Sequence, residues 1–163
     1  MIDQTQTRRS ALAWLAAGVA VPVLAACGSA AEAKTYKVAF SENEWRKKLT
    51  SAQYAVLREE HTEPAFSSPL DHEKRKGTFA CAGCDNALYS SETKFDSGTG
   101  WPSFYRPLPG AIGTSTDYKI GYPRTEVHCA DCGGHLGHVF KDGPPPTGLR
   151  YCMNGDALKF RAA

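Results

Sequence analysis

The chain has 163 residues, of which 42% are hydrophobic, and its formal net charge at pH 7 is +2. This apolar fraction is enough for one hydrophobic core and indicates a soluble, single-domain protein. A charge so close to neutral argues against nucleic acid or another polyanion as a partner.

Residues 1–26 are typical of an export signal. Arg8 and Arg9 precede an uncharged stretch, Ala11 to Ala26, that is shorter than the roughly 20 residues of a membrane-spanning helix. The paired arginines resemble a twin-arginine signal, although Ala11 stands where a bulky apolar residue is usual, and an ordinary secretory signal is the alternative. Loss of two arginines and one aspartate with this signal lowers the net charge from +2 to +1. We therefore expect an exported, periplasmic domain.

Residues 27–40 are predicted to be a tether. Leu24-Ala25-Ala26-Cys27 resembles a bacterial lipoprotein processing site, which predicts an acylated Cys27 and a lipid anchor at the membrane facing the periplasm. Alternatively, Cys27 is removed by a later cleavage near Ala31 or Ala33. Twin-arginine export, which moves folded proteins, would let a metal load before the thiols meet an oxidising compartment.

The folded domain is predicted to begin with two short helices. The capping-box patterns Ser41-x-x-Glu44 and Thr50-x-x-Gln53 predict helices that run to about Leu49 and to about Glu60. Their spacing predicts a buried face that contains Trp45, Leu49, Tyr54 and Leu57. Pro64 and Pro69 end the helical region.

From Gly77 onward the sequence changes to short apolar runs separated by glycine and proline, which is typical of antiparallel sheets. The predicted fold class is therefore mainly β, of the α+β type. The predicted strands are residues 87–90, 103–106, 116–120, 125–129, 136–140 and 149–153.

Six cysteines form two matched pairs and two single residues. Cys81-Ala-Gly-Cys84 and Cys129-Ala-Asp-Cys132 each carry two thiols across a turn of small residues, and 44 residues separate the pairs. This pattern is typical of one structural Zn²⁺ held by four thiolates. Two disulfides, or a thioredoxin-like redox pair, are the alternatives.

The last two predicted strands bring several polar groups to one surface. Side chains repeat every two residues, so alternate positions of each strand share a face. If His138 lies opposite Cys152, these faces join, whereas a slip of one residue separates them. The shared residues would be Arg150, Cys152 and Asn154 from one strand and His138, Phe140 and Asp142 from the other.

Cys152 is the candidate nucleophile. We expect Arg150 and a nearby imidazole to lower the pKa of Cys152, and His135 or His138 to hold a proton or orient a water. A single cysteine is commonly just a small buried side chain. The presence of Cys152 together with two histidines, an arginine and four paired cysteines that could hold a metal favours an active site.

Four stretches of the chain resemble the methionine-R-sulfoxide reductases. They are Cys81 to Cys84, Lys94 to Phe104, His128 to Phe140 and Arg150 to Asn154, and the similarity runs from about Ser41 to Phe160. The resemblance implies a reductase domain at residues 41–163 with two antiparallel sheets and N-terminal helices. It also implies an enzyme that reduces methionine R-sulfoxide in oxidised proteins or peptides.

The resemblance implies roles for individual residues. Zinc would be held by Cys81, Cys84, Cys129 and Cys132, and Cys152 would be the nucleophile. Trp101 would pack against the methyl group of the substrate, with Phe140 in the same substrate site. The polar pocket would be arranged by His135, His138 and Asn154, with support from Asp142 and Arg150.

The chemistry requires a thiolate and a proton source together, because the sulfoxide oxygen leaves only if it is protonated while its sulfur is attacked. We expect Cys152 to attack, a water or an imidazole at His135 or His138 to protonate the oxygen, and Cys152 to end as a sulfenic acid. Thr99 stands where many family members carry a resolving cysteine. A thioredoxin-like protein or another external thiol is therefore the expected reductant.

Two other classes of protein remain open. A zinc-ribbon binding module would depend on the four paired cysteines alone and would function without Cys152. A disulfide-stapled secreted domain would bind no metal and contain no free thiols.

Overall fold

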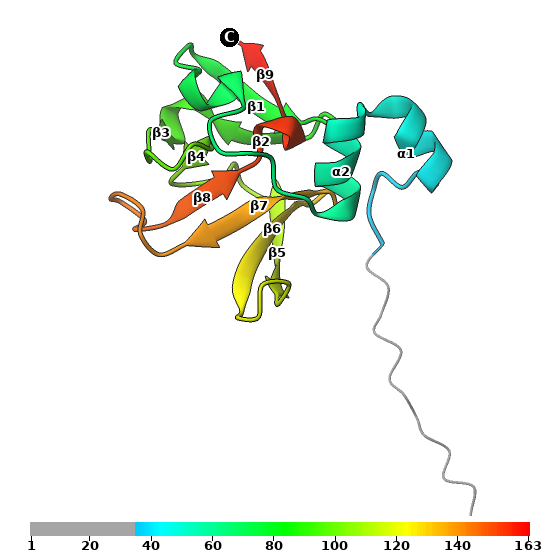
Figure 1. Cartoon of the computed structure of the whole chain (residues 1–163). Coiled ribbons are helices and arrows are strands. Elements are labelled where there is room, and N and C mark those ends of the chain that lie inside the picture. The colour runs from blue at the N-terminus through cyan, green and yellow to red at the C-terminus, as the bar shows by residue number, and fades with distance from the viewer. Residues whose placement is uncertain (1–34) are drawn as a thin grey trace, which may run out of the picture. The chain divides into compact units, whose positions relative to one another are not determined.

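The computed structural model describes residues 35–163 (Figure 1). The two α-helices of this part are α1 (Glu42–Lys48) and α2 (Ser51–Glu59). Its strands are β1 (Gly77–Cys81), β2 (Ala87–Ser90), β3 (Lys94–Phe95), β4 (Ser103–Phe104), β5 (Ile112–Asp117), β6 (Arg124–Cys129), β7 (His135–Phe140), β8 (Arg150–Met153) and β9 (Leu158–Ala162). Short 3₁₀ helices lie at η1 (Pro69–His72), η2 (Ser91–Thr93) and η3 (Gly155–Ala157).

Both predicted capping boxes are present. The Ser41 hydroxyl accepts a hydrogen bond from the Glu44 backbone N–H at 3.4 Å, and the Thr50 hydroxyl accepts one from the Gln53 backbone N–H at 3.2 Å. The helices begin and end within one residue of the predicted positions. The four apolar residues assigned to their buried face, Trp45, Leu49, Tyr54 and Leu57, are all buried.

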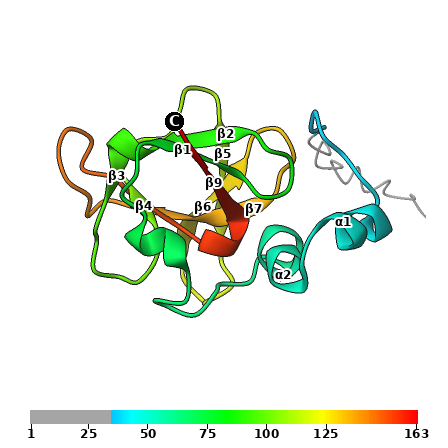
Figure 2. The same cartoon turned by 90° about the horizontal axis from the view of Figure 1, so that it is seen from above.

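The strands form two antiparallel sheets, as predicted for the fold class (Figure 2). The smaller sheet has the order β2-β1-β9, and the larger has the order β3-β4-β8-β7-β6-β5. The strands expected at 87–90, 125–129, 136–140 and 149–153 are confirmed to within one residue at each end.

The strand predicted at 116–120 is wrong, because β5 ends at Asp117 and the chain then turns, with the Gly121 backbone N–H bonded to the Tyr118 carbonyl. The actual strand is rich in threonine, serine and glycine and carries little apolar signal. The strand expected at 103–106 covers only its first two residues. Strands β1, β3 and β9 were not predicted. β1 and β9 pair across more than 70 residues, which no local pattern encodes.

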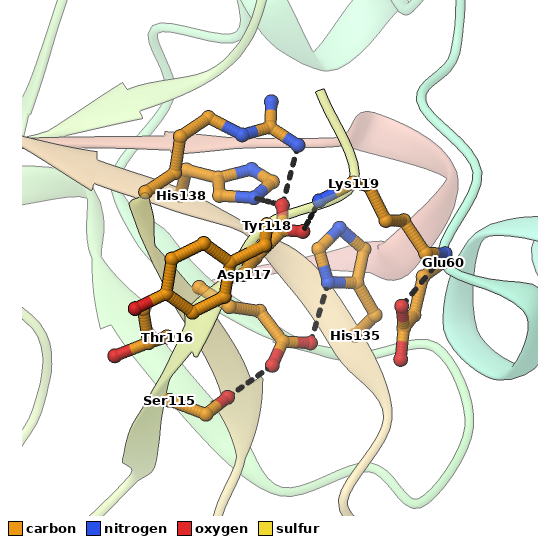
Figure 3. A pocket seen from close by; sticks show the side chains of 10 residues that line it. Glu60, Ser115, Thr116, Asp117, Tyr118, Lys119, His135 and His138 are labelled. Carbon is orange, nitrogen blue, oxygen red and sulfur yellow. Dashed lines mark hydrogen bonds and ion pairs between the residues drawn. The ribbon is translucent and has the colours of Figure 1, made fainter. Parts of the chain in front are cut away.

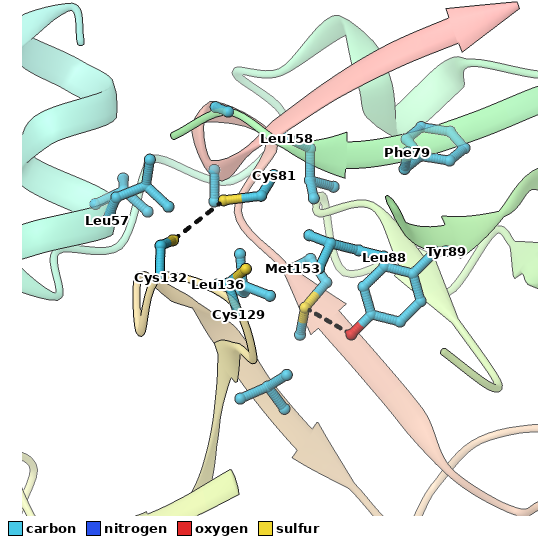
Figure 4. Packing of buried hydrophobic residues seen from close by; sticks show 14 of the residues in the cluster. Leu57, Phe79, Cys81, Leu88, Tyr89, Cys129, Cys132, Leu136, Met153 and Leu158 are labelled. Carbon is cyan, nitrogen blue, oxygen red and sulfur yellow. Dashed lines mark hydrogen bonds between the residues drawn. The ribbon is translucent and has the colours of Figure 1, made fainter. Parts of the chain in front are cut away.

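The core contains residues of both sheets and of helix α2, and Figure 4 shows part of it. Tyr89 stacks on Phe104 with ring centroids 4.3 Å apart. The Tyr89 hydroxyl lies 3.1 Å from the sulfur of Met153 (Figure 4). Met153 is fully buried there. Because side chains alternate along β8, burial of Met153 in the core directs Cys152 to the opposite face.

Residues 35–40, the last part of the predicted tether, contact the domain. The Val38 backbone N–H donates to the Asp131 carbonyl at 2.8 Å, and the ring of Phe40 packs edge-on against Trp45. Neither α-helix of residues 35–163 has the length and apolar character needed to cross a membrane. The export signal at 1–26 and Cys27 lie outside the described residues, so those assignments stay predictions.

Candidate functional site

The four paired cysteines converge on one point. Their sulfur atoms all lie within 4.8 Å of one another, with 3.7 Å between Cys81 and Cys132 and 3.5 Å between Cys84 and Cys129. The two turns are built alike: the Asp85 N–H bonds to the Cys81 carbonyl and the Gly133 N–H to the Cys129 carbonyl, each at 2.9 Å. Both of those donors adopt a left-handed conformation, with φ of 66° and 68°.

This geometry fits a tetrahedral metal ion. Four sulfurs at about 2.3 Å from a central Zn²⁺ would be about 3.8 Å apart, close to the distances between these sulfurs. A disulfide requires about 2.05 Å, and all five cysteines of residues 35–163 are free thiols. Without an ion, hydrogen bonding to the other three thiols, together with burial, raises the pKa of Cys81. A cation would instead stabilise the thiolates.

A second site surrounds Cys152. The predicted register is confirmed, because His138 pairs with Cys152 and Phe140 with Arg150 across β7 and β8. The resulting cavity has a volume of about 130 Å³. Its lining consists of Thr62, Trp101, Arg124, Gly137, His138, Phe140, Cys152 and Asn154. Gly137 is required at this point, since a Cβ there would come within 2.1 Å of the Cys152 carbonyl oxygen.

The thiol of Cys152 lies beside a group of hydroxyls. Thr99 Oγ1 is 3.9 Å from Cys152 Sγ, and Ser97 Oγ is 2.8 Å from both Thr99 Oγ1 and Ser103 Oγ. Burial raises the pKa of Cys152 and outweighs the opposing effects of Thr99 and Arg150. Arg150 lowers the pKa of Cys152 as expected, but no imidazole contributes, and desolvation of the thiolate is larger, so the net shift is upward and not downward.

Arg150 and Asp142 form a bidentate pair, with Nε to Oδ1 at 3.0 Å and Nη2 to Oδ2 at 2.8 Å. These hydrogen bonds lower the pKa of Asp142. The guanidinium carbon of Arg150 lies 4.5 Å from the ring centroid of Phe140. Arg150 thus connects Asp142 to Phe140, which forms one wall of the Cys152 cavity.

Glu63 joins two of the cavity residues and was missed by the sequence analysis. Its carbonyl accepts from Trp101 Nε1 at 3.2 Å, and its N–H donates to Asn154 Oδ1 at 3.0 Å. The buried carboxylate accepts the N–H groups of Gly155 and Asp156 at 2.7 and 2.8 Å. Burial raises the pKa of Glu63. No local pattern predicts this role, because the contacts span up to 93 residues.

The two predicted histidines take different positions. His138 lines the Cys152 cavity, and its Nε2 lies 2.8 Å from Asp117 Oδ2. His135 does not line that cavity; its Nδ1 lies 2.7 Å from Glu126 Oε1 in a neighbouring polar cavity of about 330 Å³ (Figure 3). His138 and Arg124 line both cavities.

The acidic partners of these histidines were missed as well. Contacts with His128 and His135 lower the pKa of Glu126. Alternation along the predicted strand at 125–129 places Glu126 on one face with His128, a signal that was not used. Asp117 lay within the strand predicted at 116–120, but that strand was wrong, so its pairing with Arg124 was not predicted.

The fold combines two antiparallel sheets with a four-cysteine cluster that can hold a metal ion and a cavity built around one free thiol, which defines a class of cysteine enzyme with a separate metal-binding cluster. Comparison with known proteins identifies the class further. The family described as the SelR domain matches residues 49–162. The chain therefore belongs to the methionine-R-sulfoxide reductase family.

Individual relatives named as methionine sulfoxide reductases support this family assignment. The chain is 54% identical to the peptide methionine sulfoxide reductase MsrB of Agrobacterium fabrum over 125 residues, which is 76% of this chain and 93% of the relative. It is 56% identical to the MsrB of Bradyrhizobium diazoefficiens over 124 residues, or 76% and 89%. It is 47% identical to the mouse mitochondrial methionine-R-sulfoxide reductase B3 over 137 residues, or 83% and 54%.

Proposed function

We propose that this protein reduces peptide-bound methionine R-sulfoxide to methionine and so repairs oxidised proteins. The observation that carries this function is the Cys152 thiol in a cavity with an indole and an imidazole, within a chain of this family. The indole of Trp101, with Phe140, suits the terminal methyl group of the substrate. The polar groups suit the polarised S–O bond.

In this proposal Cys152 supplies two electrons. Its sulfur attacks the sulfoxide sulfur, the S–O bond breaks, and the oxygen ends on Cys152 as a sulfenic acid that carries one proton. Because burial raises the pKa of Cys152, the resting thiol brings that proton into the reaction. A water or the imidazole of His138 passes the proton to the oxygen. The ring of His135 lies next to that of His138, with centroids 5.3 Å apart. Asn154 keeps the pocket in shape, and Asp142 and Arg150 support it.

An external thiol completes the cycle. Two thiols reduce the sulfenic acid and yield the Cys152 thiol, one disulfide and one water. This proposal is supported by Thr99, whose hydroxyl, and not a thiol, lies 3.9 Å from Cys152 Sγ. We propose a thioredoxin-like protein as the donor.

We propose Zn²⁺ as the ion on the four paired cysteines. Four sulfur ligands at tetrahedral spacing favour zinc, and a closed set of four protein ligands is typical of a structural ion. The ion would hold the two cysteine turns together and take no part in the redox step.

We also propose that the protein is exported to the periplasm, with Cys27 acylated as a lipid anchor. The support is the paired arginines and the Leu24-Ala25-Ala26-Cys27 sequence. Mass spectrometry of protein isolated from the producing cell tests this. We expect a mature chain that begins at Cys27 with added acyl mass; an intact Met1 in all of the material would contradict export.

The reductase activity can be tested with a peptide that contains both sulfoxide epimers. With dithiothreitol as donor, we expect only the R epimer to be consumed, as chiral chromatography would report. In one turnover without donor, dimedone should label Cys152 alone, because no second thiol lies beside it among residues 35–163. Equal consumption of both epimers, or labelling elsewhere, would contradict the assignment.

A further inference from the structure

His138 is held from one side only. Its Nε2 lies 2.8 Å from Asp117 Oδ2, and the same carboxylate oxygen accepts a hydrogen bond from Arg124 Nη2 (Figure 3). This arrangement follows from strand pairing. Asp117 pairs with Arg124 across β5 and β6, and His138 pairs with Cys152 across β7 and β8. Between these pairs, Glu126 of β6 lies opposite both His138 and Ser115 of β5, so Asp117 lies two positions along β5 from the row of His138 and Cys152 and reaches His138 diagonally.

The state of Asp117 fixes the tautomer of His138. A hydrogen bond from the Lys119 backbone, with further ones from His138 and Arg124, lowers the pKa of Asp117 to about 2. An ionised carboxylate only accepts hydrogen bonds, so His138 Nε2 must carry the hydrogen. Burial lowers the pKa of His138. The ring is therefore neutral near pH 7, and Nδ1 is an unprotonated acceptor.

Nδ1 of His138 has no hydrogen-bond partner within the described residues. Among residues 35–163, the only fully buried side-chain nitrogen or oxygen without a hydrogen-bond partner is Arg124 Nε. The unpaired Nδ1 of His138 is therefore not fully buried. Solvent therefore reaches Nδ1, and the cavities that His138 lines supply that space. The charged and titratable groups around His138 are Asp117, Arg124, Glu126, His135 and Cys152.

We propose that Asp117 is a positioning residue in a Cys152–His138–Asp117 triad, with Arg124 holding its carboxylate in place. The proposal rests on the proposed reductase function. The Cys152 proton passes to His138 Nδ1 as the thiol sulfur attacks, and the imidazolium then delivers it to the sulfoxide oxygen. The Nε2–H bond to Asp117 stabilises the imidazolium between these two transfers.

The transfer path includes the substrate or a water. No hydrogen bond joins Cys152 and His138 within the described residues, although both line one cavity. A sulfoxide oxygen or a water placed in this cavity bridges them. The proton that leaves Cys152 ends on the oxygen of the sulfenic acid, so the reductive half-reaction needs no other acid.

Asp117→Asn tests the triad in the zinc-loaded full-length protein. The substituted amide would retain the shape of the side chain but could present an N–H to His138 and would lose the charge that stabilises the imidazolium. We expect kcat for the peptide sulfoxide to fall by about 100-fold or more. KM should change little, because Asp117 does not line the Cys152 cavity. Glu42→Gln, which removes a carboxylate from an exposed ion pair on α1, is the matched control and should behave as wild type.

Nitrogen NMR reports the tautomer of the His138 ring. A change in packing without loss of the Asp117 carboxylate would not alter this tautomer. In the wild type we expect the Nε2–H tautomer, and in Asp117→Asn a shift toward the Nδ1–H tautomer. An Asp117→Asn protein with kcat within about threefold of wild type, while Cys152→Ser is inactive, overturns the triad and leaves the reductase function standing. A wild-type protein in which His138 carries its hydrogen on Nδ1 also overturns it, because Asp117 would then not fix the ring. A wild-type protein that reduces no sulfoxide overturns both.

Discussion

Replacing Cys152 with serine should abolish turnover of methionine sulfoxide, with a fall in kcat of roughly 10⁴-fold or more. A hydroxyl is a far weaker nucleophile than a thiol and cannot form the sulfenic acid that stores the oxygen. The fold should persist, because the change is nearly isosteric and Cys152 Sγ makes only a weak contact with Thr99. We expect an unfolding free energy within about 1 kcal/mol of wild type.

The metal content provides the control for this variant. Cys152 is not among the four clustered sulfurs, so Cys152→Ser should retain one metal ion per chain in elemental analysis. Full reductase activity in this variant would disprove the mechanism. It would favour the alternative of a zinc-ribbon binding module, for which Cys152 is dispensable.

The arrangement of the Cys152 face could be predicted because it depends on short-range rules. Alternation along β7 and β8 gives the faces, and the pairing of His138 with Cys152 gives the register. The cysteine pairs were predictable for a similar reason, since each is a local turn that needs only small residues.

Other parts of the site depend on contacts that no local pattern contains. A register irregularity near Val127 and His128 pairs His128 with His135 and brings the rings of His135 and His138 to 5.3 Å, although these two residues are three positions apart in the sequence. Simple alternation would place these two histidines on opposite faces. The contacts of Asp117 with His138 and of Glu126 with His135 therefore became visible only in the structure.

The pKa of Cys152 illustrates a second limit. The sequence shows the nearby cation of Arg150 but not the burial of the thiol, and burial is the larger effect. The sign of the shift is thus reversed from the predicted one. The resting nucleophile is therefore a thiol that must lose its proton during the reaction, and His138 is the proposed acceptor of that proton.

Removing one metal ligand should have the largest effect on stability. Cys81 ends β1 in the smaller sheet and Cys129 ends β6 in the larger sheet, so an ion on the cluster joins the two sheets. Structural zinc sites contribute roughly 10 kcal/mol or more, which is comparable with the whole stability of a domain. We therefore expect Cys84→Ser to lose the metal and the cooperative thermal transition, as elemental analysis and circular dichroism would show.

Cys84 is the informative ligand because it is the one that is only half-buried, so its replacement by serine changes packing least. Cys152→Ser is the matched control, with the same chemical change at a thiol outside the cluster. Loss of folding in Cys84→Ser but not in Cys152→Ser would assign the stability to the ion and not to thiol packing. A Cys84→Ser protein that melts cooperatively near the wild-type temperature without metal would show that the core alone joins the sheets.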